Sequence, residues 1–211
     1  MKKYFSVFLL ITIVGISALL LSFVFESSIS KKVEASDQAQ TISVSVTSTL
    51  TFSVATSTLA LGTLTPGVAV IATTSATVST NAANGWTLSI KRDDANSTLD
   101  LSTDAATDFP DYTAWSSSSP NSTTTPGATL SFRVMTTGTD GALYNSTWWG
   151  SDDTTNAKYA GLPPTSQSVA TIGSYVATSQ SVVYKFRADA PATQKTGSYD
   201  GAITLTALVS I

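Results

Sequence analysis

The stretch Asn84-Gly85-Trp86-Thr87-Leu88-Ser89-Ile90-Lys91 decides the fold class of this chain. Its Asn-Gly pair is a strong signal for a tight turn between two strands. After the turn, Trp86, Leu88 and Ile90 alternate with polar residues, which is typical of a strand with one face in the core and one in solvent. Such half-buried strands form antiparallel sheets, so the stretch predicts one, with these three side chains in its core.

The same period of two recurs along most of the chain, and no segment after residue 35 has a convincing helical period. The other apolar residues at this spacing are Ile42, Val44 and Val46; Leu50, Phe52 and Val54; Leu130, Phe132 and Val134; Val182, Tyr184 and Phe186; and Ile203, Leu205, Ala207, Val209 and Ile211. Turn signals such as Gly161-Leu162-Pro163-Pro164 separate them. We expect an all-β protein, an antiparallel β-sandwich with long Ser/Thr/Asp-rich loops at 93–125 and 138–165.

Composition excludes several classes of active site. The 211 residues include no histidine and no cysteine, so Ser-His-Asp and Cys-His centres, CxxC redox motifs, thiolate or imidazole zinc sites and disulfides are all impossible. Residues 36–211 carry twelve Asp against seven Lys or Arg, an acidic balance that argues against a nucleic-acid partner. We therefore expect no enzymatic activity, although paired aspartates make a secreted glycan hydrolase a third hypothesis.

The N-terminus has the features of an export signal. Lys2 and Lys3 precede an uncharged apolar run over 4–25, and Val33-Glu34-Ala35 offers a cleavage site. The run is also long enough to cross a bilayer as a helix. Residues 1–35 are therefore interpreted as a signal peptide or a retained membrane anchor, two alternatives that the sequence leaves open, and 36–211 as an extracellular domain at the cell surface.

Two stretches resemble the motifs of the WxL-domain family of bacterial cell-surface proteins. Gly85-Trp86-Thr87-Leu88 is similar to the first motif, and Tyr199 with Ile203-Thr204-Leu205-Thr206-Ala207 stands where the second is expected, with Leu205 and Ala207 in place of its Trp and Leu. The resemblance implies export, non-covalent attachment to peptidoglycan and no catalysis. From their positions we expect Trp86 and Leu88 to be core residues and Tyr199 to be a corner tyrosine that fixes the entry of a strand.

Aromatic residues gather in the two predicted long loops. Trp148 and Trp149 are adjacent, so in a strand they would point to opposite faces and one would be exposed. The candidate ligand-binding residues are Trp148, Trp149, Tyr144, Tyr159 and Trp115, with Tyr112 nearby. Together they could form a platform that stacks on sugar rings of a cell-wall polysaccharide or peptidoglycan. The alternative is that these rings pin the loops onto the sandwich.

Aspartates cluster in the same loops. The groups are Asp93, Asp94 and Asn96; Asp104, Asp108 and Asp111; and Asp152 and Asp153. Carboxylate and amide oxygens are calcium ligands, so a Ca²⁺ site is a possible interpretation, but none of the groups has EF-hand spacing and solvated surface carboxylates are the alternative. No other cofactor is expected.

Residues 41–55 give the last functional hypothesis. They are uncharged and strongly alternating, and they follow the leader directly. Such a segment can add to the sheet edge of a neighbouring copy and so build a surface fibre or coat. The alternative is that it pairs within its own domain. The sequence thus predicts attachment to cell-wall glycan first and self-association second.

Overall fold

The computed structural model describes residues 43–116 and 126–210. The predicted leader with its hydrophobic helix, Ile42 and Ile211 therefore lie outside the described residues. The chain divides into two units, Met1–Ser45 and Val46–Ile211, and every strand of the described residues belongs to the second unit.

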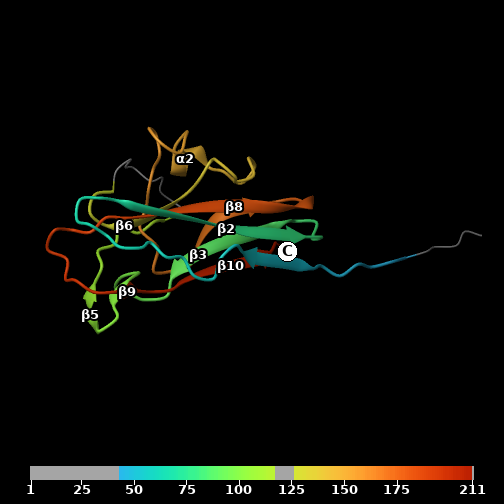
Figure 1. Cartoon of the computed structure of the whole chain (residues 1–211). Helices are drawn as coiled ribbons and strands as arrows, with labels where there is room; N and C mark the ends of the chain where they lie inside the picture. Colours follow the sequence, from blue (N-terminus) through green and yellow to red (C-terminus); the bar gives the residue numbers. More distant parts are fainter. Residues whose placement is uncertain (1–42, 117–125, 211) are drawn as a thin grey trace, which may run out of the picture. The chain divides into compact units, whose positions relative to one another are not determined.

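Antiparallel strands make up almost all of the described secondary structure (Figure 1). The four-stranded sheet has the order β1 (Leu50–Val54), β2 (Val70–Thr80), β8 (Val176–Ala188) and β6 (Leu130–Val134). A three-stranded sheet has the order β10 (Ile203–Val209), β3 (Trp86–Arg92) and β7 (Gln167–Ile172), and a small one joins β5 (Asp104–Asp108), β4 (Asp100–Leu101) and β9 (Tyr199–Asp200). The short helix α2 spans Ser146–Trp149. The predicted all-β, sandwich-like fold is confirmed.

The core lies between the four-stranded sheet and the β10-β3-β7 sheet. Along β3 the side chains alternate between buried and half-buried, and Trp86, Leu88 and Ile90 are almost wholly buried, as predicted. Val78 of β2 and Phe132 of β6 belong to the same core from the opposite sheet. Burial of each such side chain contributes about 1.5–3 kcal/mol, so this alternation is the main source of stability.

The predicted Asn-Gly turn places β3 in register. Gly85 has φ of +72°, and a Cβ there would come within 2.1 Å of the Ile172 carbonyl oxygen. Only glycine fits this left-handed position against the β7 backbone. The turn therefore lets the start of β3 pass close to the end of β7.

The two stretches that resemble family motifs are neighbouring strands. Leu205 pairs with Ile90, Ala207 with Leu88 and Val209 with Trp86, so β10 and β3 present their apolar residues on the same side. Upstream of β10, the Tyr199 hydroxyl donates to the Lys195 carbonyl at 2.8 Å. Tyr199 is half-buried and belongs to strand β9, where it pairs with Leu101, so its role as a corner tyrosine stays a prediction.

Three expectations about the strands are wrong. Residues 43–49 were expected to form a strand, but they are extended without strand pairing and fully exposed. The Gly161-Leu162-Pro163-Pro164 signal marks no simple turn, because Gly161 bridges to Ala114 and residues 159–163 are buried. Strands β2 and β7 were not predicted, because their Ala, Ser and Thr residues hide the apolar alternation.

Candidate functional site

The predicted aromatic platform contains a helical turn rather than a strand. Asn145 caps α2, and its side-chain oxygen accepts hydrogen bonds from the backbone N–H groups of Thr147 (3.0 Å) and Trp148 (3.2 Å). Trp148 and Trp149 therefore do not point to opposite faces of a sheet. Trp149 is fully buried and Trp148 half-buried.

The three tryptophans of this region pack on one another. The Trp115 ring centroid lies 5.4 Å from that of Trp148 and 5.2 Å from that of Trp149, and Trp149 lies 5.3 Å from Phe132 of β6. Since Trp115 and Trp149 are buried, their faces are not open to a sugar ring. The tryptophans pin the loops onto the edge of the sandwich, as the alternative interpretation predicts.

The tyrosines surround a buried cation instead of extending the tryptophan cluster. Arg133 is fully buried, donates to the Tyr144 hydroxyl at 3.0 Å and lies 5.8 Å from the centre of the Tyr159 ring. Tyr159 is buried, while Tyr144 and Tyr112 are half-buried. The structure therefore divides the five candidate residues between two packed clusters and presents no open platform built from them.

Asp153 balances the charge of Arg133. Its carboxylate lies 3.0 Å from the guanidinium and accepts the backbone N–H groups of Thr136 and Thr137. Burial acts to raise the pKa of Asp153, but these hydrogen bonds and the arginine outweigh it and lower the pKa. This carboxylate is an anchor for the loop that follows β6.

Three more aspartates of these groups have protein partners. Asp111 forms a buried ion pair with Arg92 at 2.7 Å, although burial still raises its pKa. Asp104 pairs with Lys195 at 3.1 Å, and Asp152 accepts hydrogen bonds from Thr154 and Asn156. Among residues 43–116 and 126–210, no group of three or more acidic side chains is placed to hold a metal ion.

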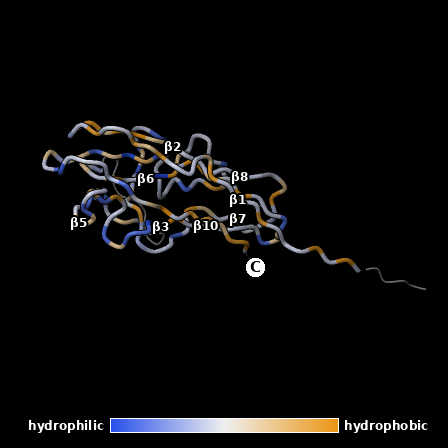
Figure 2. The backbone as a smooth tube through the Cα atoms, turned by 60° about the horizontal axis from the view of Figure 1, so that its bottom comes forward, coloured by the Kyte–Doolittle hydropathy of each residue, from blue (hydrophilic) through white to orange (hydrophobic). Residues whose placement is uncertain are grey.

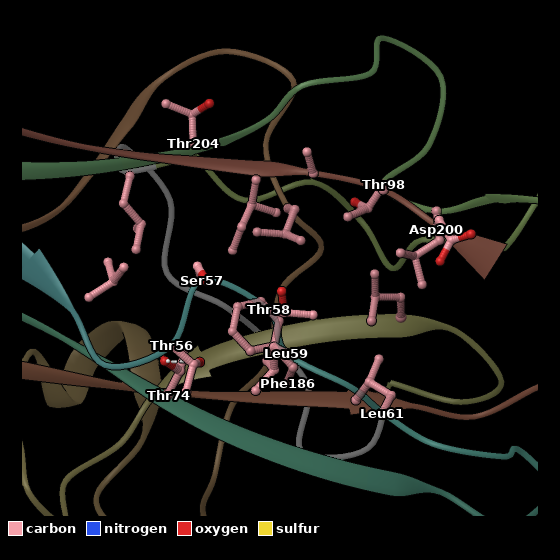
Figure 3. A pocket seen from close by; sticks show the side chains of 18 of the residues that line it. Thr56, Ser57, Thr58, Leu59, Leu61, Thr74, Thr98, Phe186, Asp200 and Thr204 are labelled. Atoms are coloured by element: carbon pink, nitrogen blue, oxygen red, sulfur yellow. Dashed lines mark hydrogen bonds between the residues drawn. The ribbon is translucent and has the colours of Figure 1, made fainter. Parts of the chain in front are cut away.

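A groove that the sequence did not predict opens between β1 and β10. Its volume is about 630 Å³, and it is lined by Phe52 and Val54 of β1, Ile203 and Leu205 of β10, and the segment 56–61. Figure 3 shows Thr56, Ser57 and Thr58 crossing this space between the two sheets, while Thr204 points away from it. The groove is the open side of the sandwich.

Apolar side chains that face the sandwich interior are left uncovered along this groove. Phe52 pairs with buried Val78 and Val54 with buried Ala76, so both are on the core side of β1, yet they remain 37% and 41% exposed. On β10, Leu205 and its neighbours on the core side are only half-buried, although their partners on β3 are buried. At this edge, the apolar side chains on the core side of each sheet are thus partly exposed to solvent.

Strand β10 has a free hydrogen-bonding edge on this side. Among the described strands it pairs with β3 alone, and its seven residues include no charge, no proline and no glycine. Edge strands of soluble proteins usually carry lysine, proline or a bulge that blocks addition of another strand. Strand β7, at the other edge of the sheet, has a register shift opposite Leu88 and Ser89, whereas β10 has regular pairing.

No protein-family model and no curated protein matches this chain. Within the described residues, no helix is long and apolar enough to cross a membrane.

Sequence reasoning did not find the groove, because the groove depends on which strands are neighbours in the fold. The signal available in the sequence was the uncharged alternation of residues 203–209.

Proposed function

We propose that this chain is an exported, non-catalytic structural subunit of the cell surface that associates with further copies of itself. The observation that carries the proposal is the groove between β1 and β10 with the free edge of β10 beside it. The leader motif and the resemblance to WxL domains support export and a surface location. Attachment to peptidoglycan or another cell-wall glycan remains a prediction from that resemblance, because three of the five loop aromatics expected to make it, Trp115, Trp149 and Tyr159, are buried.

Self-association follows from two unsatisfied features at one place. Covering Phe52, Val54 and Leu205 removes apolar surface from water, which contributes roughly 25 cal/mol per Å². A strand added to β10 also satisfies its free backbone N–H and C=O groups. A glycan could contact the hydroxyl and aromatic groups that also line the groove, but it would not pair in register with the free backbone groups of β10.

Sedimentation velocity of the full-length chain in mild detergent, over a range of concentrations, tests the proposal. The detergent keeps residues 4–25 from driving aggregation. We expect species larger than the monomer that increase with concentration, and ordered assemblies by negative-stain electron microscopy. A chain that stays monomeric at all concentrations but pellets with purified cell wall would contradict self-association and favour glycan attachment.

A matched pair of variants shows whether the β10 edge is responsible. Leu208→Lys puts a charge on the outward face of β10, and Ile71→Lys puts one on the outward face of β2; both native side chains are more than half exposed. Leu208→Lys should shift the association towards monomer, while Ile71→Lys should not. Equal behaviour of the two variants would place the contact elsewhere.

A further inference from the structure

We infer that the occupant of the groove is residues 43–49 of a second copy of this chain, added as a strand to the free edge of β10. This inference rests on the proposed self-association and names the segment that makes it. It joins two features of the described structure: the groove beside the free edge of β10, and an exposed alternating segment that pairs with no strand of its own copy.

The donor segment is built like a strand but has no strand partner. Residues 43–49 read Ser-Val-Ser-Val-Thr-Ser-Thr, are extended and expose Val44 and Val46 at 90% and 80%. Figure 2 shows apolar positions recurring along the described chain before β1. β-Branched residues in alternation favour the extended conformation, so little ordering remains to be done when a sheet edge becomes available.

The acceptor matches this segment in length and pattern. Strand β10 has seven residues, as does the segment 43–49, and both are uncharged, so no repulsion or desolvation of charge opposes their pairing. In a strand added to β10, Val44 and Val46 on the core side would lie beside the row that contains Leu205 and Ala207 and would cover Phe52. Ser43, Ser45, Thr47 and Thr49 would then face solvent beside Thr204 and Thr206, and Ser48 would share the core side with the two valines.

Contacts within one copy favour a second copy as the donor. The Asn81 side chain accepts a hydrogen bond from the Thr49 N–H at 2.6 Å and donates to the Thr47 carbonyl at 3.0 Å. The Thr80 hydroxyl also donates to the Thr49 carbonyl. These bonds hold the segment at the four-stranded sheet, whereas β10 belongs to the other sheet. A contact between different surfaces of identical copies is heterologous and continues into a filament unless it closes into a ring.

Disulfide cross-linking tests this pairing well because the native chain has no cysteine. Full-length chains with Val46→Cys are mixed with chains carrying Leu205→Cys or Ala207→Cys and oxidised, so that only contacts between copies are recorded. Thr206→Cys, one residue away on the outer face of β10, is the control. We expect at least about tenfold more covalent dimer with position 205 or 207 than with position 206, because disulfides require Cβ atoms about 4 Å apart.

A single chain that carries Val46→Cys and Ala207→Cys distinguishes the remaining outcomes. A ladder of covalent oligomers supports donation between copies. An intrachain disulfide in a monomer would overturn it, since the segment would then close its own groove. If the chains associate in sedimentation but form no cross-link at position 205 or 207, the donated strand is overturned and the proposed function stands. If the unsubstituted chain shows no association at all, both are overturned.

Discussion

Two edge strands of this sandwich, β6 and β10, differ in how far other parts of the chain cover them. At β6, Phe132 bridges to Ala160 and Leu130 to Asp111, and the tryptophans cover the strand. At β10, no described segment beyond β3 pairs with the strand, and the apolar row beside it is partly open. Both edges are equally uncharged on their core sides, so the difference comes from the two long loops, which supply Asp111 and Trp115 as well as Trp149 and Ala160 to one edge and leave the other free. Closure of an edge is therefore a property of loops as much as of strands.

The largest expected effect is a loss of stability when a buried ring beside β6, the closed edge, is removed. Trp149→Ala removes a fully buried ring that touches Trp115 and Phe132, so it should cost about 3–5 kcal/mol of unfolding free energy. Trp148→Ala, at a half-buried position in the same helical turn, should cost clearly less. Urea denaturation followed by circular dichroism measures both. Equal costs would show that burial does not decide the role of the two residues.

The next effect also concerns the closed edge. Arg133→Met removes the buried guanidinium and leaves the Asp153 carboxylate with its two backbone donors. We expect a loss of about 3 kcal/mol, at the low end for breaking a buried pair because Asp153 keeps these hydrogen bonds. Arg133→Met combined with Asp153→Asn should recover part of the loss in the same denaturation assay. A double variant no better than the single one would exclude the uncompensated charge as the cause.

At the open edge, one deletion should abolish assembly while it changes the stability of the fold only slightly. Deleting residues 43–49 removes the hydrogen bonds to Asn81 and Thr80 but no core residue, so the free energy of unfolding should change by about 1–2 kcal/mol at most. Sedimentation of the same variant should nevertheless show monomer. A deletion that unfolds the chain would mean that the segment is integral to its own domain.

The smallest effect is a dependence on acid. Hydrogen bonds from Asn156 first, and then Thr154, lower the pKa of Asp152 from 3.8 to about 2. A lowered pKa in the folded state stabilises the chain above pH 4, and this contribution is lost as the pH falls from about 4 to about 2. Asp152→Asn should therefore melt slightly below the native chain at neutral pH and approach it at pH 2. A constant difference in melting temperature would show that the charge of Asp152 is not involved.

The sequence predicts the parts of the fold that bury large side chains. In β3, β6 and β8, aromatic and branched residues mark one face so clearly that alternation alone finds the strand. Strand β2 escaped because its core side includes Ala76, and the expected strand over Val44 and Val46 failed because alternation reports compatibility with a sheet, not the presence of a neighbour. Pairing is a property of the whole chain.

The candidate site was less predictable than the fold. Adjacent Trp148 and Trp149 suggested a strand with one exposed ring, but the capping oxygen of Asn145 folds them into a helical turn. The groove arises where two strands that are distant in sequence, β1 and β10, end their respective sheets. No local pattern carries that information, because an edge is defined by what is missing beside it.

The two hydrogen bonds of Asn81 have a mechanical consequence. In an assembly of donated strands, the donor segment would continue directly into β1 at Leu50, and Asn81 would hold the last residues of the donor at both Thr47 and Thr49. A link clamped at two backbone points has little freedom to swivel. Filaments made in this way would be stiff, with a long persistence length. Asn81→Ala would shorten the persistence length without changing how many copies each filament contains.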